Sequence, residues 1–215
     1  MSFLNPYAQG GWDNPLNQFP GAVRGVPIPS IQGALPHIPS GIPAGADQQH
    51  LSFIFEPQGQ NSGVLNCIVM GPDSRPRFYI TSNNSSSGAV ITTIKDEGGN
   101  LAATIEWQLH PVVQLQTYSN NVPRQFSSQF LPLSQSRTSR EMSVKGKSYL
   151  WTRDPERDCV YLHNISYTPR EYLAYLSRSA GGPVVLSVLP SAVSQGLLDV
   201  AILATTLFFS NRSID

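Results

Sequence analysis

The stretch LLDVAILATTLFF, residues 197–209, is the strongest structural signal in this 215-residue chain. At about 100° of rotation per residue, its apolar side chains cover nearly the whole circumference of a helix. A helix that is apolar on almost all sides lies either inside a protein or inside a lipid bilayer. The side chains expected to form a buried core helix are Leu197, Leu198, Ile202, Leu203, Leu207 and Phe208.

The length of this helix favours enclosure by protein over a membrane anchor. The predicted helix covers residues 194–210, roughly 25 Å at 1.5 Å per residue, whereas a bilayer span needs about 20 apolar residues. Asp199 near its start would cost about 2.5–3.5 kcal/mol at the bilayer centre. We therefore expect the chain to wrap around this helix, and the membrane anchor stays as the alternative.

Composition and charge indicate a globular domain without a strongly charged partner. Hydrophobic residues make up 40% of the chain, enough for a core. The 14 basic and 14 acidic residues cancel, which argues against nucleic acid as a partner. The first residues show no secretory signal pattern, so the predicted location is the cytoplasm, with peripheral membrane association as a further option. Cys67 and Cys159 are expected to be free, buried thiols, and a disulfide is the minority alternative.

Residues 1–46 differ in composition from everything that follows. They hold 8 of the 18 prolines and 7 of the 17 glycines but only two charged residues. Such a segment predicts a disordered tail with polyproline-II character, followed by one domain over residues 47–215. The near-repeat PIPS, HIPS and GIPA within residues 27–44 fits a motif for a protein partner, but a plain spacer is favoured because no base flanks a PxxP.

From residue 50 onward, short β-branched and aromatic runs alternate with turn residues, which predicts about eleven or twelve strands. Strands that must enclose an apolar helix do so most economically as a closed barrel, which also removes exposed edges. The fold class is therefore mainly β, a barrel of about twelve antiparallel strands around one C-terminal hydrophobic α-helix. The strands are expected at residues 51–55, 64–70, 77–82, 89–95, 100–109, 112–118, 125–133, 148–152, 159–163, 168–177 and 181–189.

Two of these strands carry specific expectations. Residues 100–109 alternate cleanly, so one face of the strand should be buried and the other wet. Residues 168–177 fit a strand, although Tyr172 and Tyr175 also fit the i, i+3 spacing of a helix. The residues expected on the buried face of the first strand are Leu101, Ala103, Ile105 and Trp107.

The chain resembles a known group of proteins in three segments that occur in the same order. These are TTIKDEGGNLAATIEWQ (92–108), KGKSYLWTRDPERDCVYL (145–162) and the apolar terminal helix. Together they resemble uncharacterised fungal proteins of the basidiomycete type. Those proteins carry a domain of unknown function related to the tubby-like superfamily, which also includes LURP-one-related proteins and phospholipid scramblases. Over roughly residues 50–210, the resemblance implies a barrel of about twelve strands threaded by a C-terminal helix.

The resemblance also implies functions, of which one is not expected here. Tubby domains bind phosphoinositide headgroups through Lys and Arg on the barrel. Scramblases carry a cysteine-rich palmitoylation segment, to which the isolated Cys67 and Cys159 do not correspond. No acidic calcium-associated stretch is recognisable either, so scramblase-like activity is not expected.

Basic residues gather in the region 137–157, where they suggest a possible lipid site. If Lys145, Lys147 and Arg153 flank one hairpin, they could bind anionic lipids, since each base near an anionic surface contributes about 1 kcal/mol. From the residues alone, solvating surface charges are the favoured interpretation. The basic residues of the region are Arg137, Arg140, Lys145, Lys147, Arg153 and Arg157.

No catalytic, cofactor or metal site is predicted. The chain has no nucleophile elbow, Walker loop or dinucleotide fingerprint, and its four histidines, at 37, 50, 110 and 163, lack metal-ligand spacing. Asp199 as a buried acid in a pocket is the remaining enzymatic alternative. The predicted function is a non-enzymatic module that binds lipids or phosphoinositides at membranes. The alternative is an adaptor that recruits proteins through the proline-rich tail.

Overall fold

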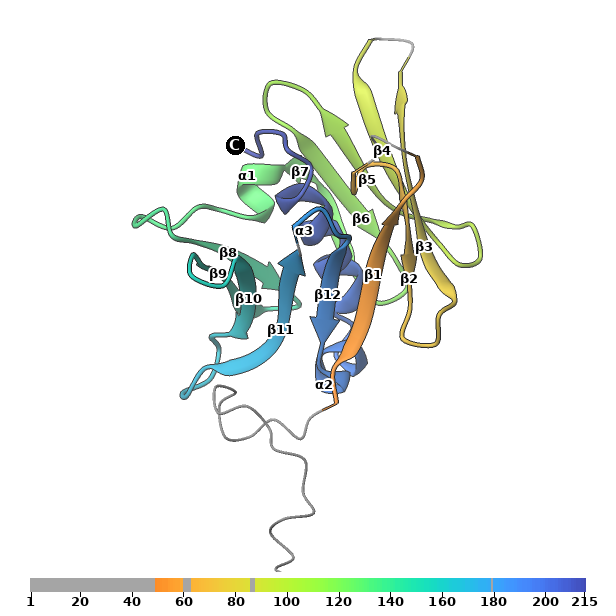
Figure 1. The fold of residues 1–215 in the computed structure, drawn as a ribbon. Coiled ribbons are helices and arrows are strands. Elements are labelled where there is room, and N and C mark those ends of the chain that lie inside the picture. Colours follow the sequence, from red (N-terminus) through yellow and green to blue (C-terminus); the bar gives the residue numbers. More distant parts are fainter. Residues whose placement is uncertain (1–48, 60–62, 86–87, 179) are drawn as a thin grey trace, which may run out of the picture. The chain divides into compact units, whose positions relative to one another are not determined.

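The described part of the chain contains one antiparallel sheet and three short helices. The computed structural model describes residues 49–215 except 60–62, 86–87 and 179. The predicted tail and its near-repeat lie outside these residues. The strands are β1 (Leu51–Pro57), β2 (Cys67–Met70), β3 (Pro76–Asn84), β4 (Val90–Asp96), β5 (Leu101–Trp107), β6 (Val112–Gln116), β7 (Asn121–Phe126), β8 (Ser139–Val144), β9 (Lys147–Asp154), β10 (Cys159–Asn164), β11 (Glu171–Arg178) and β12 (Val184–Val188), and the helices are α1 (Ser127–Phe130), α2 (Pro190–Ser194) and α3 (Leu198–Phe208) (Figure 1).

The order of the strands explains how one sheet surrounds a helix. From edge to edge, the order is β7-β6-β5-β4-β3-β2-β1-β12-β11-β10-β9-β8, so most neighbours are joined by simple hairpins and β1 joins the two halves through β12. The mainly β architecture with antiparallel strands is confirmed. In the described residues, the outer strands β7 and β8 pair with no common partner, and the sheet is open there.

The open edge of β8 is covered by the chain segment that follows α1. Leu133 forms an antiparallel bridge with Arg140, and the Glu141 backbone N–H donates to the Pro132 carbonyl at 2.9 Å. The N–H of Ser134 also donates to the carbonyl of Ser139 at 2.9 Å. This coverage protects part of a strand edge that would otherwise offer its backbone to other chains.

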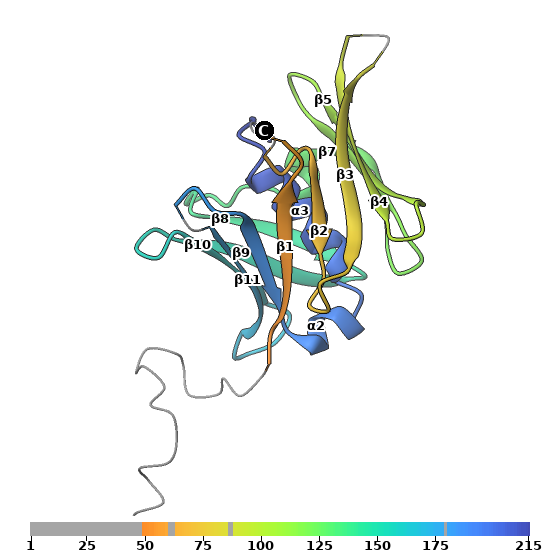
Figure 2. The same ribbon diagram turned by 45° about the vertical axis from the view of Figure 1, so that its right-hand side comes forward.

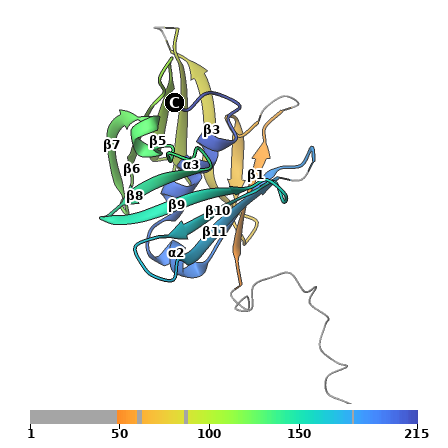
Figure 3. The ribbon, with the colours of Figure 1, turned by 90° about the vertical axis from the view of Figure 1, so that its left-hand side faces the viewer.

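The terminal helix is enclosed, as its apolar circumference predicts. Residues 200–207 of α3 are at most 1% exposed, and the apolar side chains among them belong to the main hydrophobic core. Figures 1 and 3 show α3 between the β3–β6 part of the sheet and the β8–β11 part, and Figure 2 shows β1 and β2 running across it. Of the predicted core residues, Leu198 and Phe208 are half-buried and the rest are buried: Leu197, Ile202, Leu203 and Leu207.

Two buried threonines lie on this apolar helix without leaving a polar group unpaired. The hydroxyl of Thr205 donates to the Ala201 carbonyl at 2.7 Å, and that of Thr206 donates to the Ile202 carbonyl at 2.8 Å. Hydrogen bonds within the helix remove the cost of burying these hydroxyls. The narrow polar side of the helix can therefore be buried as well as its apolar sides.

The predicted helix over residues 194–210 is divided in the structure. The short α2 begins with Pro190 and ends at Ser194, and α3 begins only at Leu198. Gly196 between them has φ of 78°, a left-handed conformation that interrupts a right-handed helix. The Ser194 hydroxyl donates to the Ser191 carbonyl, and no side chain caps the start of α3. None of the described helices is long and apolar enough to cross a membrane.

Two β-bulges change which side chains face the core. Along β5, the pairing with β4 shifts between Ile94 and Lys95, and Leu101 becomes 53% exposed while Ala102 is buried. The expectation that Leu101 lies on the buried face was therefore wrong. Ala103, Ile105 and Trp107 are buried as predicted. A bulge places two residues opposite one partner, so the alternation inverts beyond it.

The second bulge lies in β11, and it explains the helix-like spacing of two tyrosines. The pairing of β10 with β11 shifts between Leu162 and His163, so that Leu173 and Ala174 are consecutive and both fully buried. Tyr172 and Tyr175 consequently lie on the same outer face, three residues apart. The strand predicted over residues 168–177 is confirmed from Glu171 onward, since β11 covers Glu171–Arg178.

The region around residues 119–146 is where the predicted elements differ most from the structure. Strand β8 was not predicted, because only Met142 and Val144 interrupt its polar sequence. Residues 125–133, predicted as a strand, contain the end of β7, the helix α1 and a loop. Pro123 in β7 is compatible with its position at the edge of the sheet, where a missing N–H breaks no ladder bond.

Candidate functional site

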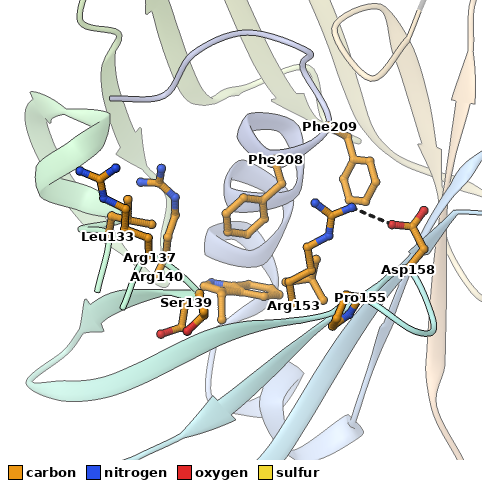
Figure 4. A pocket seen from close by; sticks show the side chains of 12 residues that line it. Leu133, Arg137, Ser139, Arg140, Arg153, Pro155, Asp158, Phe208 and Phe209 are labelled. Atoms are coloured by element: carbon orange, nitrogen blue, oxygen red, sulfur yellow. Dashed lines mark hydrogen bonds and ion pairs between the residues drawn. The ribbon is translucent and has the colours of Figure 1, made fainter. Parts of the chain in front are cut away.

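A groove of about 450 Å³ lies where the C-terminal end of α3 meets the inner face of β8, β9 and β10 (Figure 4). It forms because α3 ends at Phe208, next to the strand pair whose outer edge is not paired with β7. The groove is open to solvent and carries both aromatic and charged side chains. The lining residues are Leu133, Arg137, Thr138, Ser139, Arg140, Trp151, Arg153, Pro155, Asp158, Val160, Phe208 and Phe209.

The floor of the groove is aromatic. Trp151 of β9 is 1% exposed, and its ring packs edge to face against Phe208, with 5.4 Å between the ring centroids. Phe208 and Phe209 are half-buried because they follow the last fully enclosed turn of α3. The indole N–H of Trp151 is buried and has no hydrogen-bond acceptor among the described residues. Buried donors without an acceptor are uncommon, since leaving one unpaired costs about 1–3 kcal/mol.

Three arginines surround this floor. Figure 4 shows Arg137 and Arg140 on one side of Phe208, and Arg153 on the other with Asp158. The three arginines are accompanied by two carboxylates, Asp158 in the lining and Asp215 paired with Arg140, so the formal charge of the groove is +1. A protein with zero net charge therefore carries a locally positive, partly apolar depression.

Arg140 is the least exposed of the three arginines that line the groove, and its guanidinium already has hydrogen-bond partners within the protein. Its side chain is 13% exposed and forms a bidentate ion pair with Asp215, at 2.9 Å and 2.6 Å. Its Nη1 also donates to the Leu131 carbonyl at 2.8 Å. The hydrogen bonds from Arg140 hold the pKa of the Asp215 carboxyl below its usual value, and the charge of Arg137 adds to this effect.

The other two arginines, Arg137 and Arg153, are more available to bind a ligand. Arg153 pairs with Asp158 at 3.0 Å, but both side chains are 69% exposed, so water competes with this pair. Arg137 lies in a turn with φ of 57° and is exposed. Its side chain forms no ion pair with the residues that the structure describes.

The structure separates the three basic residues that were predicted to bind anionic lipids. Lys145 and Lys147 flank the β8–β9 turn, whereas Arg153 lies six residues farther along β9, about 20 Å from Lys147 at 3.3 Å per residue. The Lys145 Nζ lies 3.5 Å from the Gln195 carbonyl, and the Lys147 Nζ lies 5.9 Å from the ring centre of Tyr167. Only Arg153 lines the groove, so the three do not form one patch.

Asp199, the candidate buried acid, is occupied at the other end of α3. Its carboxylate accepts a hydrogen bond from the Thr117 hydroxyl at 2.7 Å, and it is half-buried in the first turn of the helix. A carboxylate in this position is stabilised by the partial positive charge of the helix N-terminus. Neither of the two pockets described includes Asp199.

Histidines and tyrosines form a cluster on the outer face of β10 and β11, away from the groove. His50 contacts Tyr172 and Tyr175 with 5.7 Å between ring centroids, and its Nε2 lies 3.2 Å from the Tyr172 hydroxyl. Tyr161 and His163 complete the cluster, and burial lowers the pKa of His163. Among the residues described, no three His, Cys, Asp or Glu side chains are placed to share a metal ion.

Sequence reasoning identified the basic residues of the groove but not its floor. Phe208 was assigned to the core, and nothing in the sequence indicated that the end of the helix meets β9 beside Arg153. One signal was available: Trp151 and Arg153 are two apart on a strand and therefore share a face. An arginine on the same face as a buried tryptophan marks the place where the core opens to solvent.

Comparison of the chain with protein-family models, curated proteins and solved structures finds no match. The resemblance to tubby-like proteins therefore stays a prediction.

Proposed function

We propose that this domain is a non-enzymatic binding module for anionic lipids, and that the groove beside Phe208 is its binding site. The observation that carries the proposal is the combination of an aromatic floor with arginines on both sides. An anionic lipid has an acidic headgroup joined to an apolar body, and the groove offers a counterpart for each. Among the groove's lining residues, arginine cannot act as a general base, and a single exposed aspartate offers no acid–base pair.

The proposal includes peripheral binding to a membrane surface. None of the helices in the described residues could cross a membrane. In this proposal, attachment depends on the exposed side chains of the groove. Each basic residue near an anionic membrane contributes about 1 kcal/mol, which is about fivefold in affinity. The twelve antiparallel strands and the enclosed C-terminal helix support the tubby-like relationship that the sequence suggests, whereas the sheet is open where a barrel would close. We include that relationship in the proposal.

Co-sedimentation with vesicles tests the proposal directly. The full chain is mixed with phosphatidylcholine vesicles, alone or with phosphatidylserine or a phosphoinositide. We expect binding only with the anionic lipids, and binding weaker by at least about fivefold for each of Arg137→Glu and Arg153→Glu, because each change removes a positive charge and adds a negative one. Both side chains are exposed, so the substitutions should leave the fold intact.

Two further variants make the test specific. Arg75→Glu carries the same change of charge at a side chain that is 81% exposed in the turn before β3, and it should leave binding unchanged. Lys145→Glu with Lys147→Glu examines the other end of β9, where the predicted lysines lie. Equal sedimentation with and without anionic lipid would refute the proposal, and a loss in the lysine variant alone would move the site away from the groove.

A further inference from the structure

Arg140 already holds an anion that belongs to the chain itself. Two parallel N–H groups of its guanidinium donate to the two carboxylate oxygens of Asp215, at 2.9 Å and 2.6 Å. This is the arrangement in which a guanidinium receives a carboxylate or a phosphate of a ligand. Arg140 is less exposed than Arg153, and its anion-binding position is therefore already filled by Asp215 in the free protein.

The segment that supplies this carboxylate is held at Arg212, whose guanidinium lies 5.1 Å from the Trp107 ring centre, and at Ile214, whereas Asp215 beyond them is held loosely. The Ile214 carbonyl accepts a hydrogen bond from the buried Ser127 hydroxyl at 2.6 Å, and the Ile214 side chain packs against the core. Asp215 itself is 53% exposed, and apart from Arg140 its hydrogen bonds are two long ones to Ser213 at 3.4 Å. The Asp215 side chain can therefore turn away while Ile214 stays in place.

Removal of this carboxylate would leave a more complete anion site. Arg137 favours the ionised form of Asp215, so it lies within electrostatic reach of the same position, and it has no ion pair of its own among the described residues. Without Asp215, both Arg137 and Arg140 would lack a counter-ion beside the apolar floor. Two uncompensated arginines attract an anionic headgroup more strongly than one does.

We propose that Asp215 is an internal competitor, whose carboxylate occupies the anion position at Arg140 until the anionic headgroup of a lipid displaces it. This inference rests on the proposed function and concerns the regulation of the same groove. A site that is partly occupied by its own chain binds ligand more weakly, by the fraction of molecules in which the site is free. The affinity of the groove would then depend on how tightly residues 211–215 are held.

The first test compares vesicle binding by the full chain and by its Asp215→Asn variant. Asparagine keeps the size of the side chain and removes the charge, so the competitor is weakened. With vesicles of phosphatidylcholine and phosphatidylserine, we expect the variant to bind about two- to fivefold more tightly. Asp73→Asn is the matched control, since Asp73 pairs with Arg77 at 3.0 Å, is 41% exposed and lies outside the groove. It should bind as the wild type does.

The second test detects displacement itself. In the ¹⁵N-labelled full chain, glycerophosphoserine and inorganic phosphate are added separately. The amide signals of Ile214 and Asp215 are followed together with the side-chain Nε–H signal of Arg140. We expect the Asp215 signal to move as the probe reaches Arg140, with a smaller change at Ile214. An anion that shifts Arg140 without shifting Asp215, or no shift with either probe, overturns the inference.

The outcomes separate the two proposals. Wild-type binding to anionic vesicles with equal or weaker binding by Asp215→Asn overturns the competitor and leaves the lipid site standing. No vesicle binding by either protein removes the lipid function. If phosphate then still displaces Asp215 in the second test, the competitor stands, but it guards a site for a free anion.

Discussion

The two cysteines illustrate how burial decides the chemistry of a single residue. Cys67 is 1% exposed on β2, and its thiol donates to the Val64 carbonyl at 3.3 Å. Burial raises the pKa of Cys67 to about 12. Cys159 on β10 is half-buried, and burial together with Asp154 and Asp158 raises its pKa as well. Both thiols are free, as the sequence predicted, but only Cys67 is buried.

These surroundings predict different reactivities. With iodoacetamide at about pH 8, Cys159 should be alkylated first and Cys67 only after unfolding in urea, because the thiolate is the reactive form.

The raised pKa of Cys67 also predicts that the stability of the protein depends on pH. Its contribution to stability is complete below the unfolded pKa of about 8.5 and is lost as pH rises toward the folded value. Mass spectrometry and urea unfolding near neutral pH and at about pH 10 check both statements. Equal alkylation of the two thiols in the folded protein would contradict them.

At the residue scale, the sequence indicated the chemistry of the candidate site better than its geometry. Arg137, Arg140 and Arg153 all belong to the basic region seen in the sequence, and all three line the groove. Lys145 and Lys147 do not, because the length of β9 separates its two ends by about 20 Å. That separation depends on where β9 begins and ends. The polar residues around Gly146 do not determine these ends from the sequence alone.

At the scale of elements, alternation predicts strands well and bulges poorly. The hairpin of β4 and β5 follows from its apolar pattern and the Gly98–Gly99 turn, and the structure confirms it. The bulges in β5 and β11 are absent from the sequence pattern, because each arises where one strand pairs with a particular partner. Leu101 faces solvent for this reason, although the sequence of its strand alternates regularly between apolar and polar residues.

Gly196 is the residue that divides the terminal helical region, and its replacement has a defined expected effect. Its φ of 78° disfavours residues with a side chain, and an added Cβ would lie 3.2 Å from the Ser119 Cβ and 3.1 Å from the Lys145 Nζ. Gly196→Ala should lower the free energy of unfolding by about 1–2 kcal/mol, measured by urea denaturation. Gly63→Ala is the control, since its Cβ would meet no atom within 4 Å. The conformational argument fails if Gly196→Ala is as stable as the wild type.

At the scale of the whole described domain, the central relationship is between one helix and one sheet. The apolar circumference of residues 197–209 required enclosure, and the structure places α3 between the β3–β6 part of the sheet and the β8–β11 part. What the sequence could not supply is the way the sheet ends. In the described residues, strands β7 and β8 end the sheet without pairing with each other, and α3 ends beside β9. The groove exists because of these two features.

Hydrogen exchange of α3 in the full chain tests the enclosure most directly. The backbone amides of residues 200–207 should exchange as slowly as global unfolding allows, because their side chains are at most 1% exposed. The edge strand β7 provides the internal reference and should exchange faster. Exchange in α3 as fast as in β7, under conditions where the protein is folded, would contradict a helix enclosed by the sheet.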